Sequence, residues 1–97
     1  ESPALKVWDE LENKGATVFF HDPYCPLVKR KGARIPSVAA EPGFLQSLDA
    51  VVVATAHKNN LDYRALVDHA PLVLDTKNIV ATQLGLTLPL PENLKRL

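Results

Sequence analysis

Three short apolar segments, each followed at once by polar residues, constrain the fold more than any other feature of the sequence. They cover residues 16–20, 50–54 and 72–74. Each has the length and the β-branched or aromatic content of a buried strand, and segments with helical periodicity alternate with them. This alternation predicts an α/β fold, a doubly wound, Rossmann-like parallel sheet flanked by helices in three layers.

Two longer segments have the periodicity of amphipathic helices. The first covers residues 3–14 and ends at Gly15, which favours a left-handed C-cap. The second follows Asp62, a residue type that commonly caps helices, and ends before Pro71. A further short helix is expected near residues 44–48, ahead of the second predicted strand.

Residues 23–43 separate the first two predicted strands and contain four of the eight prolines and two of the four glycines. We expect a long loop here, either a structureless connection or a functional, partly mobile segment. Residues 86–97 show no clear period, and no element is predicted there. The long segment 23–43 also carries a basic cluster, which either binds a phosphate or forms an ordinary solvated surface. Its members are Lys29, Arg30, Lys31 and Arg34.

Length and charge exclude several classes of protein. A chain of 97 residues forms one domain, residues 1–97, and is too short for a complete two-substrate enzyme. Its formal net charge is zero, without the basic excess expected of a nucleic-acid-binding protein. No apolar segment approaches the roughly 20 residues that span a bilayer. The single cysteine cannot form an internal disulfide, which favours a reducing cytoplasm.

The polar residues that follow the predicted strands form the candidate site, because ligands bind at the carboxyl ends of the strands in such sheets. Lys77 follows the third strand and could pair with an anionic ligand or, alternatively, with Asp75 or Asp22. Asp22 stands where a dinucleotide-binding unit has its ribose-binding acid, but the glycine-rich turn of that unit is absent. The alternative role of Asp22 is a structural Asp-Pro turn.

Metal binding and covalent catalysis are not predicted. His21, Cys25 and His57 could supply soft ligands, but no Cys-x-x-Cys or His-x-x-x-His pair anchors them. Cys25 lies between Tyr24 and Pro26, without the neighbouring groups that activate a nucleophile. We expect it to pack within the loop.

Five short motifs occur in the order and spacing of one known family. They are E-S-P-A-L at residues 1–5, H-D-P-Y at 21–24, A-T-A-H at 54–57, D-Y at 62–63 and D-T-K-N at 75–78. Together they resemble the C-terminal domain of the UDP-glucose/GDP-mannose dehydrogenase family, to about residue 80. The H-D-P-Y and A-T-x-H forms are most similar to the bacterial branch that oxidises UDP-N-acetylglucosamine, UDP-N-acetylmannosamine or a related UDP-sugar.

The resemblance implies a cytoplasmic, homodimeric, NAD-dependent enzyme that oxidises the C6 alcohol of a UDP-sugar to a carboxylate for polysaccharide synthesis. This chain would be its C-terminal UDP-sugar-binding domain, inactive alone. NAD and the catalytic cysteine would belong to other domains, so no catalytic, cofactor-binding or metal-binding residue is assigned here. Lys77 replaces a substrate-contacting arginine of the family's D-x-R-N pattern and keeps the charge without the bidentate fork. The expected substrate-binding residues are Lys77, Asn78, Asp22 and His57.

The resemblance also implies a strand, a lysine and an arginine directly before E-S-P. We expect their absence from this chain to leave an exposed strand edge, at which a second copy could pair. The alternative to the enzyme is a stand-alone, non-catalytic α/β module that binds a nucleotide or another protein.

Overall fold

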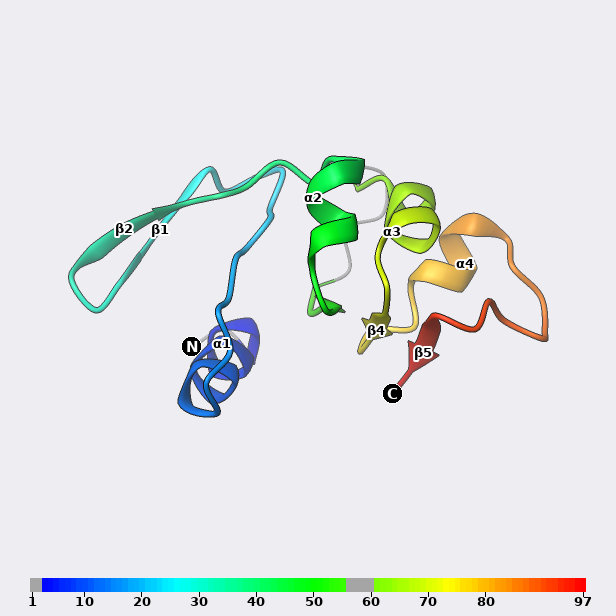
Figure 1. Ribbon diagram of the computed structural model, residues 1–97, viewed down its shortest axis with the longest axis horizontal. Helices are drawn as coiled ribbons and strands as arrows, with labels where there is room; N and C mark the ends of the chain where they lie inside the picture. The colour runs from blue at the N-terminus through cyan, green and yellow to red at the C-terminus, as the bar shows by residue number, and fades with distance from the viewer. Residues whose placement is uncertain (1–2, 56–60) are drawn as a thin grey trace. The chain divides into compact units, whose positions relative to one another are not determined.

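The structure, a computed structural model, describes residues 3–55 and 61–97. The chain divides into two compact units, residues 1–39 and residues 40–97. None of the helices in the described part is long and apolar enough to cross a membrane. In chain order, the elements are α1 (Pro3–Asn13), β1 (Leu27–Arg30), β2 (Ala33–Pro36), α2 (Pro42–Ser47), β3 (Val51–Val53), α3 (Tyr63–His69), β4 (Val73–Asp75), α4 (Val80–Leu84) and β5 (Leu94–Arg96) (Figure 1).

Helix α1, in the first unit, confirms the first predicted helix and the way it ends. Its apolar stripe is buried at Trp8, which is 6% exposed. Gly15 has a left-handed φ of 95°, and its amide donates to the Glu12 carbonyl at 3.0 Å. The next amide, that of Ala16, donates to the Leu11 carbonyl at 3.0 Å. These two bonds form a Schellman-type helix end.

The hairpin β1–β2 lies inside the segment that the sequence predicts to be an irregular loop, so that prediction is wrong. The two strands are antiparallel, and Lys29 pairs with Arg34. Lys31 and Gly32 connect them with φ values of 53° and 80°. Two positive φ values are typical of a type I′ turn, whose twist suits paired strands. A Lys-Gly turn is a weaker sequence signal than Asn-Gly or Asp-Gly, which is why the hairpin is hard to predict.

Arg30 anchors this hairpin to α1 and is therefore engaged in the fold. Its guanidinium carbon lies 4.1 Å from the centre of the Trp8 ring, and its side chain is 8% exposed. The guanidinium forms ion pairs with Asp9 and, at 3.1 Å, with Glu12. A cation this buried needs such partners. The other members of the basic cluster stay exposed: Lys29, Lys31 and Arg34.

The predicted strand over residues 16–20 is wrong, because these residues form no strand in the structure. Phe20 packs on Trp8 with ring centroids 5.6 Å apart, and its carbonyl accepts the Val38 amide at 2.9 Å. Phe19 is 50% exposed. A strand forms only by pairing with a neighbouring strand, and in this unit the described pairing is that of β1 with β2 alone.

The second unit contains a parallel sheet with the strand order β3-β4-β5. Strands β3 and β4 confirm the predicted strands over residues 50–54 and 72–74, and their parallel pairing confirms the α/β class. Nothing in the sequence predicts β5, since Leu94 is its one buried residue. Within the described residues β3 forms one edge of the sheet. Pairing of this edge with a second copy stays a prediction.

Helices α2, α3 and α4 flank this sheet and share one core with Val73 and Leu94. The chain moves from β3 to β4 through α3 and from β4 to β5 through α4, each time to the next strand in the same direction across the sheet. Because such parallel connections are right-handed, α3 and α4 lie on the same face of the sheet. Helix α3 packs against both α2 and α4 (Figure 1). The buried residues of the resulting core are Leu45, Val53, Tyr63, Leu66, Val67, Ala70, Val73, Ile79, Val80 and Leu94.

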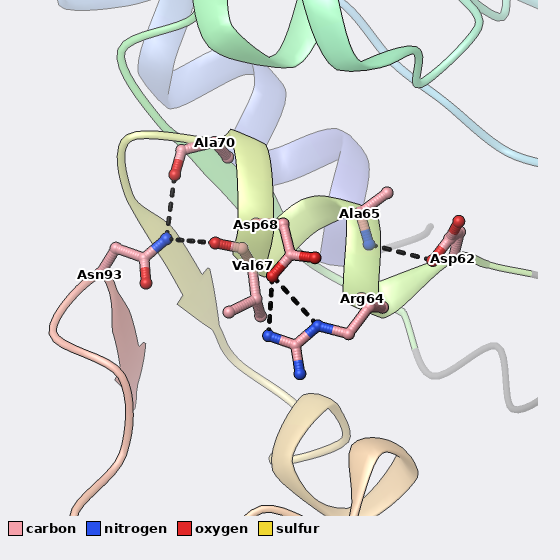
Figure 2. A network of polar contacts seen from close by, with 7 residues as sticks. All are labelled: Asp62, Arg64, Ala65, Val67, Asp68, Ala70 and Asn93. Carbon is pink, nitrogen blue, oxygen red and sulfur yellow. Dashed lines mark hydrogen bonds and ion pairs between the residues drawn. The ribbon is translucent and has the colours of Figure 1, made fainter.

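Helix α3 confirms the predicted N-cap. The carboxylate of Asp62 accepts the Ala65 amide at 2.9 Å, as Figure 2 shows. Pro71 follows the end of the helix, where a proline costs no helical hydrogen bond. Helix α2 confirms the expected short helix, although it begins at Pro42 rather than Phe44, because proline suits the first turn.

Asn93 ties the last strand to the end of α3. Its side-chain amide donates to the carbonyls of Val67 at 2.8 Å and Ala70 at 3.0 Å (Figure 2). Its own carbonyl accepts the Val73 amide at 2.7 Å, and the next residue, Leu94, is 3% exposed. One side chain thus satisfies two carbonyls at the helix C-terminus and positions the start of β5.

Replacing this side chain should loosen β5. In Asn93→Ala, two carbonyls lose their donor, so we expect the free energy of local opening over residues 91–97 to fall by about 1–3 kcal/mol. Amide hydrogen exchange of that segment measures the change. Glu92→Ala, at an exposed neighbouring position, is the matched control. Unchanged exchange in Asn93→Ala would contradict the anchoring role.

Candidate functional site

The carboxyl edge of the parallel sheet is the candidate site. The strand register aligns Val53, Asp75 and Arg96, the last residues of β3, β4 and β5. The segment after β4, residues 76–78, therefore starts beside the end of β3 on one side and the end of β5 on the other. The sequence predicts the first two strand ends, but not the third.

Asp75 organises the segment that follows β4. Its side chain is fully buried, and its carboxylate accepts three main-chain amides. These are the amide of Lys77 at 3.0 Å and those of Ile79 and Val80, both at 2.8 Å. The carboxylate thus satisfies amides at the start of α4, which no helical carbonyl can reach. Asp75 binds Lys77 through the backbone, and no side-chain ion pair joins the two in the described structure.

Backbone bonds join the strands across this edge. The amide of Thr76 donates to the Val53 carbonyl at 3.2 Å, and the Thr76 hydroxyl donates to the same oxygen at 2.6 Å. On the other side, the Leu97 amide donates to the Asp75 carbonyl at 3.1 Å. The edge is therefore held from both neighbouring strands, which keeps the side chains after β4 in place.

Lys77 and Asn78 are exposed at this edge. Asn78 has a φ of 53°, in the left-handed region that asparagine tolerates better than most residues. Its side-chain oxygen accepts a bond of 3.4 Å from the Arg96 guanidinium. Its carbonyl accepts the Thr82 hydroxyl at 3.4 Å. The structure therefore brings together two of the predicted site residues and adds Arg96, which the sequence analysis missed.

Two cations and one amide at a sheet edge suit the binding of an anion. The ammonium group of Lys77 and the guanidinium of Arg96 donate hydrogen bonds and attract phosphate oxygens. The Asp75 carboxylate is buried and already accepts three amides, so its observed role is to hold the turn. The described part of this edge therefore suits the binding and orientation of an anionic ligand.

Asp22 lies in the other compact unit, where it forms a turn. Its carboxylate accepts the Tyr24 amide at 2.8 Å, and its own amide donates to the Ser37 hydroxyl at 3.0 Å. The preceding residue, His21, bonds the Val38 carbonyl through Nδ1 at 2.7 Å. These bonds form the structural Asp-Pro turn that the sequence offers as the alternative role of Asp22. A substrate-binding role of Asp22 stays a prediction.

His57 falls outside the described residues, so its predicted substrate-binding role stays a prediction. Among residues 3–55 and 61–97, no group of three or more histidine, cysteine or acidic side chains could hold a metal ion. The Cys25 thiol donates to the Leu27 carbonyl at 3.2 Å, as expected for a cysteine packed within its own segment.

The chain does not fit the phosphate-binding turn of a dinucleotide site. Such turns need closely spaced glycines, which let the backbone approach the pyrophosphate. The four glycines of the chain are instead isolated from one another, at positions 15, 32, 43 and 85. No residue of this chain is therefore assigned to NAD.

Removing the Asp75 carboxylate should open the turn before α4. In Asp75→Ala, three amides lose a charged acceptor, and we expect the free energy of local opening to fall by about 2–5 kcal/mol. Hydrogen exchange at the Ile79 and Val80 amides measures this. Asp68→Ala, the control, removes an exposed carboxylate that pairs with Arg64. It should change the free energy of local opening by no more than about 0.5 kcal/mol. Equal protection in both variants would show that Asp75 does not hold the turn.

Comparison with known proteins identifies a family for the chain. The chain matches a family model described as the UDP-glucose/GDP-mannose dehydrogenase family, UDP binding domain, over residues 1–82. No curated protein and no solved structure matches it. The matched residues include Lys77 and Asn78 but end before β5. The bacterial branch suggested by the motifs stays a prediction. The chain belongs to the UDP-glucose/GDP-mannose dehydrogenase family and corresponds to its UDP-binding domain.

Proposed function

We propose that residues 1–97 are the C-terminal UDP-sugar-binding domain of an NAD-dependent nucleotide-sugar 6-dehydrogenase. The match to the family's UDP-binding domain carries this proposal. The enzyme oxidises the C6 alcohol of a UDP-sugar to a carboxylate, which supplies polysaccharide synthesis. It acts in the cytoplasm as a homodimer, and this domain alone is inactive.

The role of this domain is to hold the nucleotide part of the substrate. Lys77 pairs with the diphosphate, and Asn78 beside it donates its side-chain amide to the ligand. Support comes from the carboxyl edge of the sheet, where Asp75 and the neighbouring strands fix the segment that carries both residues. Asp22 and His57 contribute further contacts in this proposal, on the strength of the motifs alone.

NAD binds to another domain of the same enzyme, since the glycines of this chain offer no dinucleotide turn. The catalytic cysteine belongs to a further domain, and Cys25 has no part in the chemistry. Which UDP-sugar is oxidised depends on contacts to the sugar, which the other domains provide.

A stand-alone α/β module that binds a nucleotide or a protein is the second candidate. The coding sequence upstream of residue 1 distinguishes this module from the dehydrogenase. A Gly-x-Gly-x-x-Gly motif after a strand, followed by a cysteine in a helical region, decides for the enzyme. A stop codon or an unrelated domain decides for the module.

Lys77→Ala tests the binding role in the full-length enzyme. Loss of a charge-assisted bond to phosphate should weaken UDP-sugar binding by about 10- to 100-fold in calorimetry. Lys77→Arg keeps the charge and restores the fork, so it should bind at least as tightly as the parent. Lys95→Ala, at an exposed lysine on the opposite face of β5, is the matched control. Unchanged affinity in Lys77→Ala would remove Lys77 from the site.

A further inference from the structure

Arg96 is held at the candidate site by three independent contacts of β5. The strand pairs with β4 in a register that puts Arg96 opposite Asp75. The Asn93 side chain binds the end of α3 just before the strand, and Leu94 is buried in the core. The position of Arg96 at the carboxyl edge is therefore set by the fold and not by a loose tail.

The guanidinium of Arg96 differs from the other arginines whose contacts are described. Arg30 is paired with two carboxylates of α1, and Arg64 is paired with Asp68 at 2.8 Å. Arg96 has no carboxylate partner in the described part of the chain, and it bonds the neutral side chain of Asn78. An arginine carries five N–H donors, so this bond leaves donors for a ligand.

Among the described residues, the first amides of α4 are not available to an anion. Amides at the start of a helix often bind phosphate. Here Asp75 already occupies those of Ile79 and Val80, and its buried negative charge lies directly behind them. Side-chain cations are therefore the groups in the described part of this edge that suit an anionic ligand. Lys77 lies two residues after the end of β4, and Arg96 ends the neighbouring strand β5 and contacts Asn78.

We propose that Arg96 is a second cationic residue of the site, which binds the diphosphate group of the nucleotide beside Lys77. This proposal rests on the proposed function and deepens it. A lysine contacts phosphate as a point charge, whereas an arginine supplies a planar fork that binds two oxygens at once. Arg96, on the neighbouring strand, supplies the fork that a lysine at position 77 lacks. Asn78 orients the guanidinium through its side-chain oxygen.

The number of phosphates in the ligand provides the test. Calorimetry on the full-length enzyme compares UDP, UMP and uridine for the parent and for Arg96→Ala. We expect UDP affinity to fall by about tenfold or more, UMP affinity to fall less, and uridine affinity to stay unchanged. Arg96→Lys keeps the positive charge but loses the planar fork, so its UDP affinity should lie between those of the parent and of Arg96→Ala. It also serves as the second variant if Arg96→Ala fails to fold.

Two controls separate this inference from the proposed function. Lys95→Ala removes a cation from the same strand, and Arg64→Ala removes an arginine from the surface of α3. Both should bind UDP like the parent. Weaker UDP binding in Lys77→Ala with unchanged binding in Arg96→Ala would overturn the role of Arg96 and leave the proposed function intact. An equal loss for all three ligands in Arg96→Ala would show a structural role instead. A parent enzyme that binds no UDP would overturn both.

Discussion

The buried carboxylate of Asp75 is the interaction on which the second unit depends. It ends β4, holds the turn and satisfies the first amides of α4, so strand, turn and helix share one charged group. Burying a carboxylate is costly unless hydrogen bonds replace its water, and three amides do so here. The same arrangement decides what the edge can bind. Because Asp75 occupies these amides, side chains are the groups in the described part of this edge that remain for an anionic ligand.

The parallel strands are only three residues long, so their position depends on what flanks them. The core between the sheet and α3 buries Val73 and Leu94 at aligned register positions. Asn93 adds polar bonds where helix α3 ends. Very short strands with well-anchored ends suit a binding edge, because the side chains after them start from fixed positions while remaining exposed to a ligand.

Local signals in the sequence were sufficient for several elements. The Gly15 helix end, the Asp62 cap and the apolar strands β3 and β4 each follow from residues within a few positions. Elements that depend on distant partners could not be found this way. Residues 16–20 have the composition of a strand, but strand formation needs a neighbour that composition does not specify. Strand β5 has one buried residue and is defined by pairing with β4 and by the reach of Asn93 to α3.

The candidate site shows the same division between local and distant information. Lys77 and Asn78 follow a buried strand, so the rule for strand ends finds them from the sequence alone. Arg96 obeys that rule equally well, but only once β5 is known to be a strand. Lys77 follows β4 and Arg96 ends β5, so both place positive charge at the same edge of the sheet. Asn78 accepts a bond from Arg96, which gives the guanidinium a neutral partner in the free domain. Two positive charges at one edge attract a ligand with more than one negative charge, such as a diphosphate, more strongly than a singly charged one.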